Sequence, residues 1–178
     1  MRKRIGQQIL KYICICTALA LVACAKGESY NISHEGDRYI LSFYAEDNEL
    51  IFSKKSLGEP TVTSVGKGVY KTVYSTGTNA NYTYFIDVEQ KNVSDAYFNL
   101  LFHNENMAVF MNDGLLMVTD LFDKEQVRAQ ITRDFAPTAV PEAAITSAEI
   151  KENILYVDYL KGTQMEETHM EIRLTYEK

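Results

Sequence analysis

Short apolar runs separated by polar turn sequences recur along the chain from residue 38 to its end. The runs are rich in Val, Ile, Tyr and Phe and are bounded by Gly, Asn and Asp, a pattern typical of β-strands. It predicts strands at residues 39–44, 50–52, 61–65, 69–74, 82–88, 98–102, 107–111, 115–118, 127–135, 145–150, 154–160 and 167–176. Residues 38–178 are therefore interpreted as a single all-β domain.

The apolar pattern also indicates how the strands are buried. Runs 98–102, 107–111 and 115–118 are apolar at almost every position, which predicts burial on both faces of a sheet. Asn-Asp-Gly at 112–114 predicts a tight hairpin between the last two runs, because Asp-Gly favours the positive φ of such turns. Apolar and polar residues alternate over 155–159, which predicts a final sheet with one solvated face.

A short recurring motif indicates a repeated architecture. An acidic residue, then Asn, one spacer and an apolar strand occur three times, beginning at Asp47, Glu105 and Glu152. Meanders of three or four strands that recur about every 40–55 residues are typical of β-propeller blades. We therefore expect an all-β fold of antiparallel meanders arranged as a partial β-propeller-like stack of small sheets. A β-sandwich is the alternative.

The N-terminus has a different pattern. Arg2, Lys3 and Arg4 form a basic start, and Lys11 precedes an apolar run over residues 12–23. That run is about 12 residues long, whereas a membrane-spanning helix needs about 20. Residues 1–23 are therefore interpreted as a signal peptide.

The end of this leader carries the strongest functional signal in the chain. Leu21-Val22-Ala23-Cys24 resembles the bacterial lipobox, which the lipoprotein signal peptidase recognises. The resemblance implies diacylglyceryl transfer to the Cys24 thiol and cleavage between Ala23 and Cys24. Two acyl chains are enough for stable attachment, since each buried methylene contributes about 0.8 kcal/mol. We expect an exported protein, lipid-anchored to a bacterial membrane at the cell surface or on the periplasmic face.

Residues 24–37 are mostly polar and include Gly27 and Gly36. This segment is interpreted as the lipidated N-terminus and a tether, within which Tyr30 and Ile32 suit a short additional strand.

Charge and cysteine usage exclude several functions. The leader holds four of the 18 basic residues and none of the 24 acidic ones, so residues 24–178 carry a net charge of −10. Such a chain repels nucleic acid, which is excluded as a partner. All three cysteines lie at or before Cys24, so the domain has no disulfide and no thiol nucleophile, and its stability must come from a hydrophobic core.

Four segments in the C-terminal half resemble uncharacterised secreted, β-rich proteins of Gram-positive bacteria. The segments are residues 120–124, 133–137, 145–149 and 155–162. This resemblance implies a β-rich architecture, and that group of proteins has no known activity to carry over to this chain.

Candidate chemistry in the domain is sparse. The three histidines, His34, His103 and His169, lack a metal-ligand spacing and are interpreted as packed or solvated side chains. Carboxylates gather in the central region, where a pair would suit calcium or a glycosidase mechanism, but no binding motif supports this. These carboxylates are Asp113, Asp120, Asp123, Glu125 and Asp134. No catalytic residue, metal ligand or cofactor is assigned.

The aromatic residues give the best candidate for a binding surface. Tyr70 and Tyr74 share a face of one predicted strand, and Tyr82 and Tyr84 share a face of another. If these strands pair, the tyrosines form a ladder that binds glycans or peptides when exposed, although core packing is the favoured interpretation.

Of the possible functions, we favour a membrane-anchored, non-catalytic binding or scaffolding module with a protein or glycan ligand. The alternatives are an envelope-glycan-active enzyme that uses carboxylates and an anchored subunit of an envelope complex.

Overall fold

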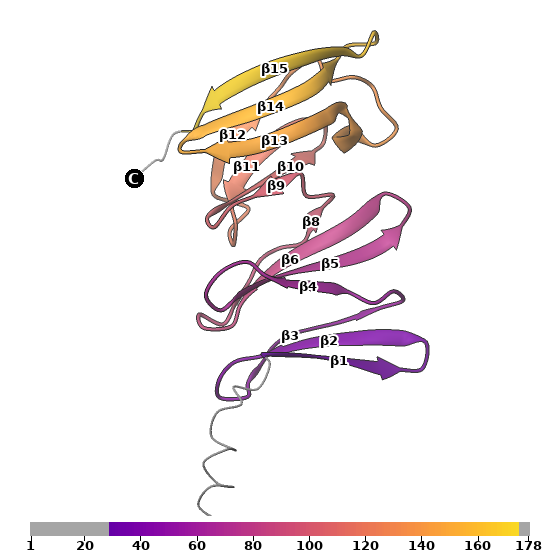
Figure 1. The fold of residues 1–178 in the computed structure, drawn as a ribbon, viewed down its shortest axis with the longest axis vertical. Helices are drawn as coiled ribbons and strands as arrows, with labels where there is room; N and C mark the ends of the chain where they lie inside the picture. The colour runs from indigo at the N-terminus through magenta and orange to yellow at the C-terminus, as the bar shows by residue number, and fades with distance from the viewer. Residues whose placement is uncertain (1–28, 175–178) are drawn as a thin grey trace, which may run out of the picture.

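The computed structural model describes residues 29–174, which form four small antiparallel sheets. The sheets follow one another along the long axis in chain order, from β1–β3 at one end to β13–β15 at the other (Figure 1). The predicted all-β stack of small meanders is confirmed. The sheets remain open, since each has two free edges.

The first sheet contains β1 (Tyr30–Glu35), β2 (Arg38–Tyr44) and β3 (Leu50–Ser56). The second contains β4 (Thr61–Ser64), β5 (Val69–Gly77), β6 (Ala80–Asp87), β7 (Asn92–Val93) and β8 (Tyr97–Phe98), with β8 paired to β6 beside β7. The third contains β9 (Phe102–His103), β10 (Met107–Asn112), β11 (Leu115–Asp120) and β12 (Val127–Ile131). The fourth contains β13 (Ile145–Lys151), β14 (Ile154–Lys161) and β15 (Glu166–Arg173), and the 3₁₀-helix η1 (Pro141–Ala144) precedes it.

Three apolar clusters lie between successive sheets. Leu41 and Phe43 of the first sheet pack with Tyr74 and Ile86 of the second. Phe85 and Tyr97 of the second sheet pack with Phe110, Met117 and Leu121 from the third-sheet region, and a larger cluster joins the third and fourth sheets. The second and third sheets therefore each pack against a neighbouring sheet on both faces. For the third sheet, the continuous apolar runs at 107–111 and 115–118 predicted this burial.

The final sheet shows the predicted alternation. Leu155, Val157 and Tyr159 are buried against the third sheet, whereas Asp158 is exposed and Tyr156 is partly exposed. Because polar residues cover its outer face, the sheet can end the stack in contact with water.

Two strand predictions are wrong. Residues 98–102 are not one strand, because Asn99 adopts a left-handed φ of 42° that breaks the chain between β8 and β9. Residues 127–135 are also interrupted, since β12 ends at Ile131. The following segment instead joins the fourth sheet, beside the end of β14 that β13 does not pair with. There the N–H of Gly162 donates to the carbonyl of Asp134, 2.8 Å away.

The ordered sheet also begins earlier than residue 38. Tyr30–Glu35 forms β1, which pairs along its whole length with β2. Tyr30 and Ile32 face the second sheet and pack against its core, which explains why this part of the predicted tether is a strand.

Candidate binding surface

The tyrosine ladder expected from the sequence forms in the β5–β6 hairpin. Tyr74 lies opposite Tyr82, and Thr72 lies opposite Tyr84, so these side chains share one face of the second sheet. Tyr70 lies on the same face of β5, two positions before Thr72. The ladder faces the first sheet.

The first sheet covers most of the ladder. The ring of Tyr70 lies 5.3 Å from that of Phe43, and the ring of Tyr84 lies 5.3 Å from that of Phe52. Tyr74 is only 3% exposed. Tyr70, Tyr74 and Tyr84 are therefore packing residues of the interface between the first two sheets, as the favoured interpretation proposed.

The fourth tyrosine is different. Tyr82 is 38% exposed, and its ring lies 5.3 Å from that of Phe98, which is 40% exposed. The two residues are register partners on β6 and β8. We call this exposed pair the aromatic edge. Sequence reasoning included Tyr82 but missed Phe98, because Phe98 opens an apolar run that was interpreted as a buried strand.

Asn99 fixes the position of Phe98. Its N–H donates to the carbonyl of Asn81, and its Oδ1 accepts the N–H of Asn81, both at 3.0 Å. This reciprocal pair ties β8 to β6 immediately after Phe98, so the aromatic edge is held by one main-chain and one side-chain hydrogen bond between Asn99 and the backbone of Asn81.

A lysine from the first sheet lies beside the ladder. Lys54 of β3 pairs with Leu41, whose side chain is buried against the second sheet, so Lys54 also faces inward. Its Nζ lies 5.1 Å from the ring centroid of Tyr84 and 5.7 Å from that of Tyr74. Among residues 29–174, no carboxylate forms an ion pair with this ammonium. Its contacts are cation–π interactions.

The buried part of the ladder contains two hydroxyls without partners. Within the described chain, neither Thr72 Oγ1 nor the hydroxyl of Tyr74 has a hydrogen bond of acceptable geometry. Burial, reinforced by Tyr84, raises the pKa of Tyr74, and the neighbouring Thr72 hydroxyl only partly opposes this effect. Tyr74 is therefore a neutral phenol at any physiological pH.

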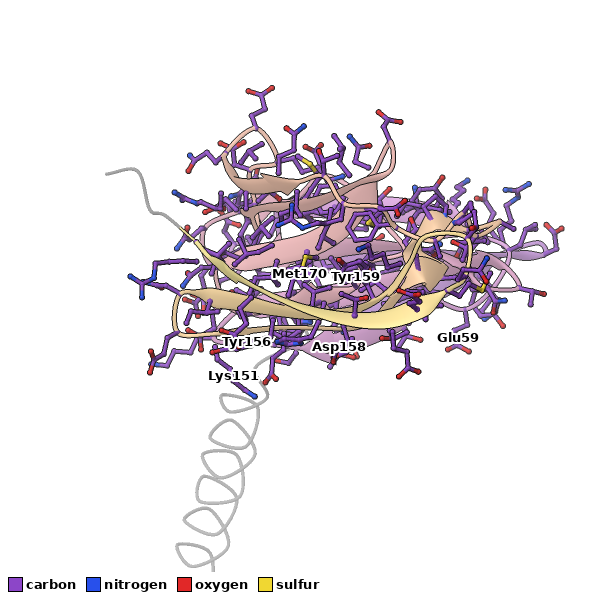
Figure 2. All side chains as sticks on the ribbon, turned by 90° about the horizontal axis from the view of Figure 1, so that it is seen from above. Glu59, Lys151, Tyr156, Asp158, Tyr159 and Met170 are labelled. Carbon is purple, nitrogen blue, oxygen red and sulfur yellow. The ribbon has the colours of Figure 1, made fainter. Side chains whose placement is uncertain are left out.

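The outer face of the fourth sheet is a second polar–aromatic surface. In Figure 2, Lys151, Tyr156 and Asp158 lie on one side of the ribbon, while Tyr159 and Met170 lie on the other, toward the third sheet. His169 and Glu171 join the first group as cross-strand neighbours from β15. We call this surface the outer C-terminal face.

Its charged groups largely satisfy one another. The Nδ1 of His169 lies 2.7 Å from the carboxylate of Asp158, and its Nε2 lies 3.7 Å from Glu171. Lys151 pairs with Glu149 at 2.8 Å. The hydrogen bond to Asp158 is the main reason that the pKa of His169 is raised above its ordinary value. This pairing is typical of a solvated cap, and it contrasts with Lys54, which pairs with no carboxylate of residues 29–174.

The carboxylates considered for catalysis or calcium mainly shape local turns. An oxygen of Asp120 accepts the N–H of Phe122 at 3.1 Å, and one of Asp123 accepts the N–H of Glu125 at 3.0 Å. Asp113 occupies the β10–β11 turn with a left-handed φ of 49°, and Asp134 lies beside Gly162. Within residues 29–174, His, Cys, Asp and Glu form no group of three or more suited to a metal ion.

The lipobox residues Leu21, Val22, Ala23 and Cys24 lie outside the described residues. Between residues 29 and 174, no helix has the length and hydropathy needed to cross a membrane.

No protein-family model matches the chain, and no curated protein sequence matches it significantly.

Proposed function

We propose that this chain is an exported, lipid-anchored protein of a bacterial envelope that binds a ligand without catalysing a reaction. The observation that carries the binding role is the aromatic edge, where Tyr82 and Phe98 expose two adjacent rings. Exposed aromatic side chains leave apolar surface in water, and aromatic residues dominate the binding energy of recognition surfaces. Lys54 supplies a cation beside the same ladder.

The lipobox supports the anchoring role. Cys24 lies six residues before Tyr30, the first residue of β1. Because an extended chain spans at most about 3.6 Å per residue, a lipid on Cys24 would hold β1 within roughly 20 Å of the bilayer. The rest of the stack would then extend into the envelope space, with the aromatic edge on its second sheet (Figure 1).

The anchor is tested by labelling cells with radioactive palmitate. We expect the full-length protein to incorporate label and to fractionate with membranes. The Cys24→Ser variant should do neither, whereas Cys16→Ser, a control within the same leader, should behave as the wild type. Equal labelling and fractionation of wild type and Cys24→Ser would contradict lipidation at Cys24.

Binding is tested by probing glycan and peptide arrays with the lipidated protein in detergent micelles. We expect Tyr82→Ala/Phe98→Ala to lose captured ligands. Leu57→Ala removes an apolar side chain that is 67% exposed in the turn after β3, and it should retain them. Identical capture by all three proteins would show that the aromatic edge does not bind.

Two further experiments distinguish the alternative functions. Release of shortened products from envelope glycans would favour an enzyme. Recovery of one stoichiometric protein partner after crosslinking in cells would favour a subunit of an envelope complex.

A further inference from the structure

We infer that the aromatic edge and Lys54 together recognise an anionic saccharide, with Lys54 as the residue that selects the negative charge. This inference rests on the proposed binding function and specifies its ligand class. Three observations carry it: the exposed ring pair, the unpaired ammonium and the arrangement of strands beneath them.

The ring pair suits a sugar. Tyr82 and Phe98 expose rings with centroids 5.3 Å apart and planes inclined by 57°. A pyranose presents C–H groups on its faces and hydroxyls around its rim, so its faces pack on exposed aromatic rings while its rim stays hydrated. The phenol of Tyr82 is itself amphipathic and matches such a ligand.

The ammonium of Lys54 selects the charge. It is half-buried over the rings of Tyr84 and Tyr74, and no carboxylate of residues 29–174 pairs with it. A ligand carboxylate would supply the missing partner through a charge-assisted hydrogen bond. Tyr84 and Tyr82 are alternate residues on one face of β6, so the cation lies over the tyrosine that is next along this face to the aromatic edge.

The net charge of residues 24–178 limits the ligand further. Residues 24–178 carry a net charge of −10, with 14 basic and 24 acidic residues, so a densely charged polyanion is repelled. Lys54 presents one ammonium group, which can neutralise one carboxylate. A saccharide with isolated acidic groups, such as a uronate, meets both conditions.

The strand arrangement disfavours an extended peptide. Peptides often bind by adding a strand to a free sheet edge. At the aromatic edge, β6 is paired with β5 on one side and with β7 and β8 on the other. β8 spans only two residues, which is too short to template another strand.

The test is calorimetric titration of the lipidated protein in detergent with three probes: a tetrasaccharide that contains a single glucuronate (the glucuronate tetramer), the matched neutral glucose tetramer and a tetrapeptide with a single glutamate (the glutamate tetrapeptide). We expect the glucuronate tetramer to bind best, and raising the salt from about 0.15 M to 1 M should weaken its binding. Lys54→Met keeps a long apolar side chain over the tyrosine rings, and it should weaken binding of the glucuronate tetramer about tenfold or more. The affinity of Lys54→Met for the neutral glucose tetramer should equal that of the wild type.

Two variants serve as controls. Lys55→Met removes the neighbouring lysine, which faces outward and pairs with Glu35, and it should bind as the wild type. Lys54→Arg retains the cation and should retain the preference for glucuronate.

The outcomes separate the two proposals. Equal affinity of the wild type for both tetramers, or full glucuronate binding by Lys54→Met, would overturn the charge selection while the binding function stands. Preference for the glutamate tetrapeptide would overturn the saccharide assignment. Failure of all three probes would overturn this inference, and the array comparison of wild type with Tyr82→Ala/Phe98→Ala would then decide on the binding function by itself.

Discussion

The imidazole of His103 packs edge-on against the ring of Phe85, with the ring centroids 4.9 Å apart. His103 belongs to β9 and Phe85 to β6, so the contact joins the third sheet to the second. The Nδ1 of His103 is buried and has no hydrogen-bond partner among the described residues. Burial lowers the pKa of His103, and the nearby cation of Lys71 lowers it further. A charge is therefore disfavoured at this interface.

This contact predicts acid sensitivity. In the unfolded chain His103 titrates near its ordinary pKa of 6.5, whereas in the folded chain its pKa is lower. The unfolded state therefore binds more protons as the pH falls below 6.5, and the free energy of unfolding decreases until the pH passes the folded pKa. We expect His103→Leu to lose less of its free energy of unfolding between pH 7.5 and pH 5 than the wild type, as measured by urea denaturation.

The exposed His34 provides the matched control for this measurement. His34→Leu replaces an imidazole that lies at the surface beside Tyr39, and the pH dependence of His103→Leu is compared with that of this variant as well as with the wild type. A pH dependence of His103→Leu equal to that of the wild type would mean that the imidazole is not held neutral in the interface.

Two buried tyrosines predict opposite results for the same substitution. The hydroxyl of Tyr97 lies 3.0 Å and 2.9 Å from the carbonyl oxygens of Asp120 and Leu121, to which it donates, whereas that of Tyr74 has no such partner. Tyr97→Phe removes the hydroxyl that bonds to both carbonyl oxygens and should lower the free energy of unfolding by about 1–2 kcal/mol. Tyr74→Phe removes an unpaired polar group and should leave it unchanged or raise it by up to about 1 kcal/mol. Chemical denaturation measures both, and equal destabilisation by the two variants would contradict the difference in bonding.

The pair formed by His169 and Asp158 predicts a titration on the surface. The hydrogen bond that His169 donates to Asp158 raises the pKa of His169 above 6.5, and Glu171 adds to the effect. Any stabilisation from this pair is complete below the unfolded pKa and is lost as the pH rises through the folded pKa. In NMR titrations, we expect the pKa of His169 to exceed 6.5 in the wild type and to fall in Asp158→Asn. An unchanged His169 pKa in that variant would assign the shift to another group.

Much of the fold could be predicted because local pattern and burial agree. The Asp-Gly turn at 113–114 and the apolar runs beside it determine β10 and β11, and the alternation over 155–159 identifies the face of the last sheet. The tyrosine register followed from strand spacing in the same way. Propensity also favours strands here, so local and tertiary preferences do not compete.

The exposure of one part of the ladder could not be predicted from the sequence, because it depends on how far the first sheet extends over the second. Tyr82 and Tyr84 are the same residue type on the same face of β6. The ring of Phe52 packs against Tyr84, whereas Tyr82 remains exposed. The contact of Lys54 with Tyr74 is likewise set by packing between sheets, which residue patterns do not encode. The break between strands at Asn99 could not be predicted from the sequence, because a single polar residue beside an apolar run gives a weak turn signal.

Asn99 predicts how the aromatic edge is supported. Its backbone has a left-handed φ of 42°, and its side-chain oxygen accepts the N–H of Asn81. Ala has neither a side-chain acceptor nor a tolerance for this conformation, so Asn99→Ala should lower the free energy of unfolding by about 1–3 kcal/mol. Asn99→Gly keeps the conformation and loses only the acceptor, whereas Asn99→Asp keeps the acceptor.

The three variants together separate strain from hydrogen bonding. We expect Asn99→Gly to lie between Asn99→Ala and the wild type in urea denaturation, and Asn99→Asp to lie closest to the wild type. β8 pairs with β6 through Phe98 and Tyr97, so loss of the Asn99–Asn81 hydrogen bonds should also weaken ligand capture. We expect Asn99→Ala to capture least, Asn99→Gly more and Asn99→Asp most of the three variants. Full capture by Asn99→Ala would show that Phe98 keeps its position through packing alone, and the reciprocal hydrogen bonds between Asn99 and Asn81 would then serve stability without serving the aromatic edge.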